Sequence, residues 1–137
     1  MFKLNLVTPE KKIVADQELE EVTVPAFVGE LHILPGHAPL MTTLEPGILK
    51  YRLKGSSEFV KTAISWGYCQ VSTESVNVLA ESAVTVEEID LKVVKEHLKS
   101  QEEKLATETM DDVQWKNTKH EIARLAAEIQ LASTGSH

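Results

Sequence analysis

The stretch GELHILPGHAPLMTTLEPG, residues 29–47, holds three of the six glycines, three of the five prolines and two of the five histidines of the chain. Glycine and proline mark turns and interrupt helices. All five prolines lie at or before Pro46, whereas residues 84–134 contain neither proline nor glycine. The chain therefore changes character near residue 84, and we expect short strands before this point and long helices after it.

Before residue 84 the apolar residues recur with a period of two. The pattern is clear in FKLNLV (residues 2–7), EVTVP (residues 21–25) and LKYRL (residues 49–53). Such alternation places one face of a strand on a core and the other towards water. Turn-rich segments separate these runs, so the sequence predicts a β-sandwich or flattened barrel of about nine or ten short strands over residues 1–84.

After residue 84 the apolar period becomes that of a helix. TVEE (residues 85–88) fits a capping box at a helix start, and Thr109 with Asp111 and Asp112 offers a second start. Two narrow apolar stripes joined by a short polar connection predict an antiparallel helical hairpin over residues 85–137. Such a pair is marginally attached unless it docks on another surface. The predicted stripes consist of Leu91, Val94, Leu98 and Leu105, then Trp115, Thr118, Ile122, Leu125, Ile129 and Ala132.

Charge and composition exclude several classes of protein. The formal net charge is −7, from 14 basic and 21 acidic residues, without a basic patch in either part. This balance argues against nucleic acid and against direct docking on anionic lipid, because both need clustered Lys and Arg. No run approaches the roughly 20 apolar residues of a membrane span, and the N-terminus lacks the pattern of a signal peptide.

No combination of residues predicts catalytic chemistry. His32 and His37 are five apart and separated by Pro35-Gly36, so they are more readily explained as turn or surface residues than as metal ligands, which must converge in threes or fours. Cys69 alternates with polar neighbours and is expected to be a buried thiol in a strand. The alternative interpretation is a small-ligand or metal-binding β-barrel protein with a helical lid, for which His32 and His37 would matter.

The opening stretch also carries a family resemblance. Together with AISWGYCQV (residues 63–71), VNVLAESA (residues 76–83) and EEIDL (residues 87–91), it resembles the epsilon subunit family of the bacterial rotary (F-type) ATP synthase. The resemblance runs from about Leu4 to Ile129, and it implies a ten-stranded sandwich followed by a helix pair.

The resemblance further implies a non-catalytic, peripheral central-stalk subunit on the cytoplasmic face of the bacterial plasma membrane. Its implied partners are the gamma subunit and the ring of c subunits, which would provide its only link to the membrane. The helix pair would fold against the sandwich or extend towards the alpha–beta hexamer and restrain ATP hydrolysis.

The resemblance also assigns expected contact residues. It places Glu30, Leu31 and His32 at the c ring, although the family usually has glycine where this chain has His32. The segment PGHAPL (residues 35–40) is the most recognisable part of the family pattern. Its central residues are expected either to contact gamma or to form a structural turn: His37, Ala38 and Pro39.

Some family members bind ATP on the helix pair, and this chain matches their motif only in part. Ile89, Asp90 and Arg124 fit the pattern, whereas Val93 and Glu128 stand where arginines are expected. An acidic side chain repels phosphate rather than pairing with it. We therefore expect no cofactor and weak or absent ATP binding. The second helix is also poor in basic residues, so we expect only modest restraint of hydrolysis.

Overall fold

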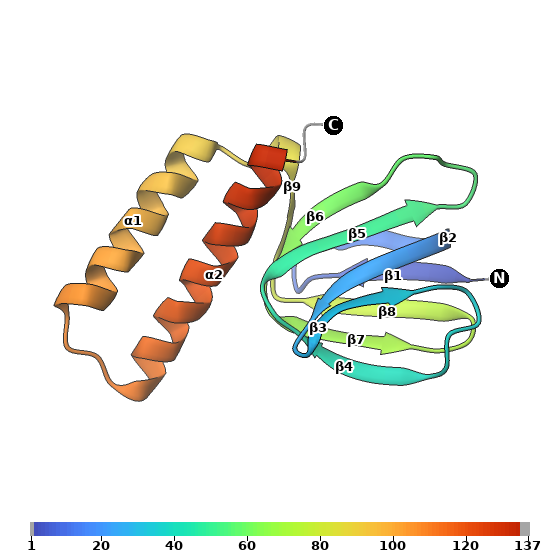
Figure 1. Cartoon of the computed structure of the whole chain (residues 1–137), viewed down its shortest axis with the longest axis horizontal. Coiled ribbons are helices and arrows are strands. Elements are labelled where there is room, and N and C mark those ends of the chain that lie inside the picture. Colours follow the sequence, from blue (N-terminus) through green and yellow to red (C-terminus); the bar gives the residue numbers. More distant parts are fainter. Residues whose placement is uncertain (1, 135–137) are drawn as a thin grey trace.

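The computed structural model describes residues 2–134 and shows a β-sandwich followed by two antiparallel helices (Figure 1). The predicted fold class is confirmed. A 3-10 turn, η1, links the last strand to the helices. The described elements are β1 (Lys3–Val7), β2 (Lys12–Ala26), β3 (Gly29–Ile33), β4 (Leu40–Leu44), β5 (Gly47–Leu53), β6 (Val60–Ile64), β7 (Gly67–Val71), β8 (Ser75–Ala80), β9 (Ala83–Thr85), η1 (Val86–Glu88), α1 (Leu91–Thr107) and α2 (Asp112–Thr134).

The nine strands of the described part form two layers that share β2. The first half of β2 pairs with β1 up to Glu18, and from Leu19 onward β2 pairs with β5 and then β3. Layer one thus has the order β3-β2-β5-β6-β9, and layer two has the order β2-β1-β8-β7-β4. Because a single long strand contributes to both layers, the described chain needs nine strands where the family resemblance implies ten.

A bulge lies where β2 passes alongside β1. Asp16 has φ of +46°, a left-handed conformation that a short polar side chain tolerates. The Asp16 backbone N–H donates to Asn5 Oδ1 at 2.9 Å, and Asn5 Nδ2 donates to Asp16 Oδ1 at 3.3 Å. The pairing register shifts between Leu4 and Leu6 at this point. Such a bulge bends its strand, which helps β2 to leave layer two for layer one.

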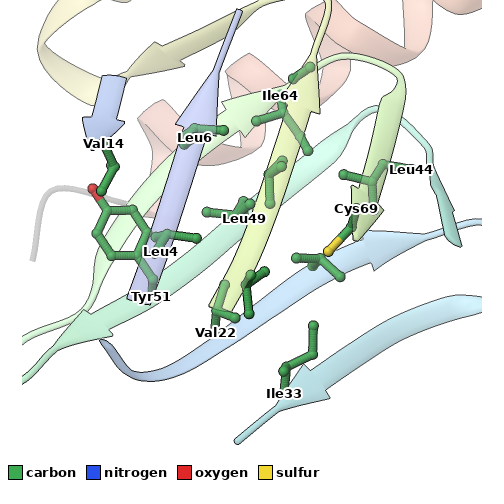
Figure 2. Packing of buried hydrophobic residues seen from close by; sticks show 14 of the residues in the cluster. Leu4, Leu6, Val14, Val22, Ile33, Leu44, Leu49, Tyr51, Ile64 and Cys69 are labelled. Atoms are coloured by element: carbon green, nitrogen blue, oxygen red, sulfur yellow. The ribbon is translucent and has the colours of Figure 1, made fainter. Parts of the chain in front are cut away.

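The core fills the space between the two layers (Figure 2). Each strand contributes its alternate inward side chains, as the period of two predicts. Fully burying one leucine or isoleucine contributes about 1.5–3 kcal/mol relative to leaving it exposed. A set of this size makes the sandwich a rigid block. The largest fully buried side chains of this cluster include Leu4, Leu6, Val22, Val24, Ile33, Leu44, Leu49, Ile64, Val71 and Val76.

The start of the helical part differs from the prediction. The Glu88 carboxylate accepts hydrogen bonds from the backbone N–H and hydroxyl of Thr85 at 3.1 and 3.0 Å, but these bonds close η1 rather than α1. The same bonds lower the pKa of Glu88. Asp90 caps α1 instead, because its Oδ1 accepts from the backbone N–H of Val93 at 3.3 Å. The intervening Ile89 is extended, so the chain cannot continue from η1 into α1 as one helix.

Helix α2 lies between α1 and the sandwich (Figure 1). One predicted stripe was partly wrong, because Trp115 is 52% exposed whereas Leu131, outside the stripe, is fully buried. The reason is that α2 has two buried faces, one on α1 and one on layer one. The second face forms a small apolar cluster in which Ala127 and Leu131 pack against Ala63, flanked by Ile48, Val84, Val86 and Ile89.

Candidate interaction surfaces

The β2–β3 hairpin ends in an exposed apolar tip. Phe27 and Val28 form its two-residue turn and are 69% and 85% exposed. Gly29 follows with φ of +123°, a backbone conformation that strains any residue with a side chain. The backbone N–H of Phe27 donates to the Thr43 carbonyl at 3.0 Å, which holds the tip beside the end of β4. The tip is therefore fixed by its backbone while its side chains stay free for a partner.

The three residues expected at the c ring do not share one face. Glu30, Leu31 and His32 are consecutive in β3, so their side chains alternate. Leu31 packs against the core cluster, whereas Glu30 and His32 are exposed on the outer side of layer one. Only Glu30 and His32 are thus placed to meet a partner on that side.

His32 belongs to a charged network on the outer side of layer one. His32 Nε2 lies 2.9 Å from Glu21 Oε1, and Arg52 Nη2 donates to Glu21 Oε2 at 2.8 Å. The hydrogen bond from Arg52, followed by that of His32, lowers the pKa of Glu21. His32 pairs with Thr23 in a regular strand, so this position does not require the glycine usual in the family. The imidazole is thus held in place by the Glu21 carboxylate.

The segment around His37 is a tight turn. The His37 backbone N–H donates to the Leu34 carbonyl at 3.1 Å, and Gly36 between them has φ of +82°. His37 Nδ1 bonds the carbonyl oxygen of Ala38 at 2.8 Å, which ties the ring to its own turn. Ala38 and Pro39 are exposed. The geometry gives His37 a structural contact and leaves its two successors open to a partner.

Layer two carries a row of outward side chains, most of them apolar, which we call the outer row. Val7, Leu79, Tyr68 and Thr43 are direct neighbours across β1, β8, β7 and β4. Met41, two residues before Thr43, is also exposed. Neighbouring exposed apolar side chains of this kind mark protein contact surfaces.

The residues of the partial nucleotide motif have structural roles. Ile89 flanks the small cluster under α2, and Asp90 caps α1. Arg124 is paired with Glu121 and also donates to Glu128 Oε2 at 2.6 Å. Val93 is exposed on α1. The guanidinium that a phosphate would need is therefore already bound by two carboxylates.

This ion pair network on α2 is largely shielded from water. Arg124 lowers the pKa of Glu121 through its hydrogen bonds, and the pKa of Arg124 itself is raised by Glu121. Glu128 is only 6% exposed, and its burial raises its pKa against the opposing effect of Arg124. The buried carboxylate thus depends on Arg124 for compensation.

Within residues 2–134, the structure also bears on a reactive cysteine, a metal site and a membrane-spanning helix. Cys69 is fully buried as predicted, and this burial raises the pKa of its thiol to about 12, which disfavours the thiolate that a nucleophile needs. No group of three or more His, Cys, Asp or Glu side chains in this part of the chain could hold a metal ion. No helix of this part is long and apolar enough to cross a membrane.

Comparison with known proteins shows to which family the chain belongs. The family model described as "ATP synthase, Delta/Epsilon chain, beta-sandwich domain" matches residues 1–86. The ATP synthase epsilon chain of Bdellovibrio bacteriovorus is 53% identical over 131 residues, covering 96% of this chain and 94% of the relative. The chain belongs to the ATP synthase epsilon chain family. The family resemblance inferred from the sequence is therefore confirmed.

Other relatives agree with this assignment. The epsilon chain of Geobacter sulfurreducens is 38% identical over 96% of this chain and 93% of the relative. A chain in the Euglena gracilis mitochondrial ATP synthase structure has the same fold, with a TM-score of 0.81 at 23% identity, covering 96% of this chain and 81% of that chain. A chain in the Tetrahymena thermophila mitochondrial ATP synthase central stalk/c-ring structure has a TM-score of 0.65 at 17% identity, and the match covers 96% of each chain. These two likenesses support the fold.

Several residues of these surfaces were not singled out from the sequence. Phe27 and Val28 could have been found as apolar residues at a predicted turn. Two other contacts join distant parts of the chain. Glu21 pairs with Arg52, and the ring of Trp66 contacts the ring of His120. No local pattern signals such contacts.

Proposed function

We propose that this chain is the epsilon subunit of a proton-translocating ATP synthase and forms part of its central stalk. In this role it couples rotation of the c ring to the catalytic alpha–beta head and contributes no catalytic group itself. The observation that carries the proposal is the 53% identity to an ATP synthase epsilon chain over almost the whole length of both proteins.

The surroundings of the groups with shifted pKa values support a non-catalytic role. Where a pKa is shifted in the described residues, the group is engaged in the fold: Glu21 and Glu121 are paired with arginines, Glu88 closes η1, and Tyr51 and Cys69 lie in the core. A general acid or base needs instead a shifted group that faces a substrate. The family function needs contact surfaces, and the chain offers these.

The β2–β3 hairpin is the proposed c-ring contact. Glu30 and His32 face outward beside the apolar tip of Phe27 and Val28, and Leu31 supports them from the core side. A rigid hairpin with both charged and apolar side chains is suited to bind the loops of a ring with which it must rotate. Through this contact the subunit would be peripheral at the cytoplasmic face of the bacterial plasma membrane, without inserting into it.

The outer row is the proposed gamma contact. Leu79 and Tyr68 are exposed side by side, with Val7 and Met41 beside them. Ala38 and Pro39 would add to this contact from the turn before β4, while His37 holds the turn in shape. Burying such a row against gamma would remove the exposed apolar surface from water.

The division of labour follows the change in the sequence near residue 84. Residues 1–84 are proposed as the docking unit and residues 85–137 as the regulatory unit. The helix pair adheres to layer one through few side chains, so it can leave the sandwich and extend towards the alpha–beta hexamer. A weakly docked element with two arrangements is what a conformational switch requires.

Binding of ATP to the helix pair is proposed to be weak or absent. Arg124 is held by Glu121 and Glu128, and Val93 offers no charge. A phosphate would have to displace carboxylates from the guanidinium and approach Glu128. Isothermal titration of the full chain is expected to show no sub-millimolar affinity for ATP, and a clear sub-millimolar isotherm would overturn this point.

Reconstitution tests the proposed function as a whole. The chain is added to a complex of alpha, beta and gamma subunits, and co-purification and ATP hydrolysis are measured with and without it. We expect stable association through gamma and restraint of hydrolysis by less than about tenfold, because exposed ion pairs anchor weakly. Failure to associate would refute the stalk assignment, whereas near-complete inhibition would refute only the weak anchoring.

A further inference from the structure

Trp66 occupies the connection between β6 and β7, where the chain passes from layer one to layer two. Its ring centroid lies 4.8 Å from that of His120 in α2, with the planes inclined by 34°. Ring pairs at such separations are attractive beyond the area that they bury. This contact holds the helix pair to the sandwich in addition to the small cluster around Leu131.

Trp66 also forms a wall of a surface cavity. The cavity has a volume of about 450 Å³ and lies at the ends of β1, β7 and β8. Its walls are mainly apolar, and three of its lining residues, Val7, Tyr68 and Leu79, belong to the outer row. The cavity therefore continues the proposed gamma contact up to Trp66, and it has room for a bulky side chain.

Glu81 is the charged residue in this lining. It is exposed, and its backbone N–H donates to the Trp66 carbonyl oxygen at 3.0 Å, so the two residues are linked. A carboxylate beside an apolar wall selects a ligand with an apolar group next to a positive charge. In a protein partner this means a bulky apolar side chain flanked by Lys or Arg.

We propose that the cavity beside Trp66 receives an apolar side chain of gamma, flanked by a basic residue that pairs with Glu81, and that its occupation favours the docked helix pair. The proposal rests on the proposed function, which supplies gamma as the partner. A side chain packed against the indole restricts its rotamers and keeps it stacked on His120. By linkage, the docked helix pair strengthens gamma binding by the same factor.

Binding measurements on the full chain test both halves of the proposal. The affinity for the complex of alpha, beta and gamma is measured for Glu81→Lys and His120→Ala, with Glu58→Lys and Lys116→Ala as matched controls on exposed positions. We expect Glu81→Lys to weaken binding about tenfold or more, since it opposes like charges. His120→Ala should weaken it about three- to tenfold, the scale of one ring contact acting through coupling.

The outcomes separate the proposal from the proposed function. Normal affinity of His120→Ala would overturn the coupling, and equal loss in Glu81→Lys and Glu58→Lys would overturn the cavity as the contact. In either case the wild-type chain still binds, so the stalk assignment stands. If the wild-type chain itself does not bind the complex, both ideas fail together.

Discussion

The sandwich and the helix pair are stabilised in different ways. The sandwich has a continuous core with side chains from all nine described strands and from Phe2 before β1, most of them fully buried. The helix pair meets the sandwich mainly through Ala127 and Leu131, the ring of His120, and the flanking residues of one small cluster. Apolar burial stabilises roughly in proportion to area. The difference teaches that one chain can combine a rigid block with a second unit that is held by far fewer apolar side chains.

The two units also differ in whether they bury a charged side chain. In the described part of the chain, the buried charged side chain is Glu128, which lies in the helix pair and not in the sandwich. A buried carboxylate adds little stability even when it is paired. It lies in the unit that is attached through the smaller apolar cluster.

The largest effect is expected for a substitution in the sandwich core. Leu4→Ala removes a fully buried side chain of β1 and should lower the free energy of unfolding by about 3–4 kcal/mol. Urea denaturation followed by circular dichroism measures it, with the exposed Lys12→Ala in β2 as the control. A loss below about 1 kcal/mol would mean that the core is not the rigid block described.

The next effect concerns the attachment of the helix pair. Leu131→Ala should weaken docking by about 2–3 kcal/mol, because Leu131 is fully buried in the small cluster. Limited proteolysis should then cut α1 and α2 faster while the sandwich fragment persists, whereas the exposed Lys116→Ala should leave the pattern unchanged. If the protease cut the helices and the sandwich equally fast, the helix pair would not be the more weakly held unit.

A smaller effect is expected in alkaline solution, and it should act on the sandwich. Burial raises the pKa of Cys69 from 9.0 to about 12 in the folded chain. A raised folded pKa means that this stability is fully present below about pH 9 and declines as pH rises towards 12, by up to about 1.4 kcal/mol per pH unit. Urea titrations from pH 8 to 10.5 measure the slope. Cys69→Ala should make it shallower, and an unchanged slope would contradict the assignment.

The smallest effect on stability is expected at the hairpin tip. Val28 is 85% exposed, so Val28→Ala should change the free energy of unfolding by less than about 0.5 kcal/mol. The same substitution should lower binding to a purified c ring, since its side chain is proposed to meet the ring. Calorimetric unfolding together with a ring pull-down separates the two readouts, and loss of stability without loss of binding would remove the tip from the contact.

Much of the fold could be predicted because the relevant signal is local. Leu4, Leu6, Val22 and Val24 alternate with polar residues, and they are buried because a strand shows every second side chain to the core. The resemblance of the opening stretch supplied the family. It could not reveal that β2 serves both layers, because the bulge at Asp16 depends on a partner in β1.

The surfaces were less predictable than the fold. Glu30, Leu31 and His32 were taken together, but strand alternation turns Leu31 towards the core. The stripe that includes Trp115 assumed one buried face of α2, whereas the helix is covered on two sides and therefore buries Leu131. Which faces are covered depends on how the helices dock, and periodicity alone does not contain that information.

Native-state hydrogen exchange of the full chain tests most directly whether the molecule consists of a rigid block and a releasable helix pair. The account predicts that amides of α1 and α2 exchange through an opening with a markedly lower free energy than amides of β1, β2, β5 and β8, which should exchange only on global unfolding. A single opening free energy shared by helices and strands would contradict it.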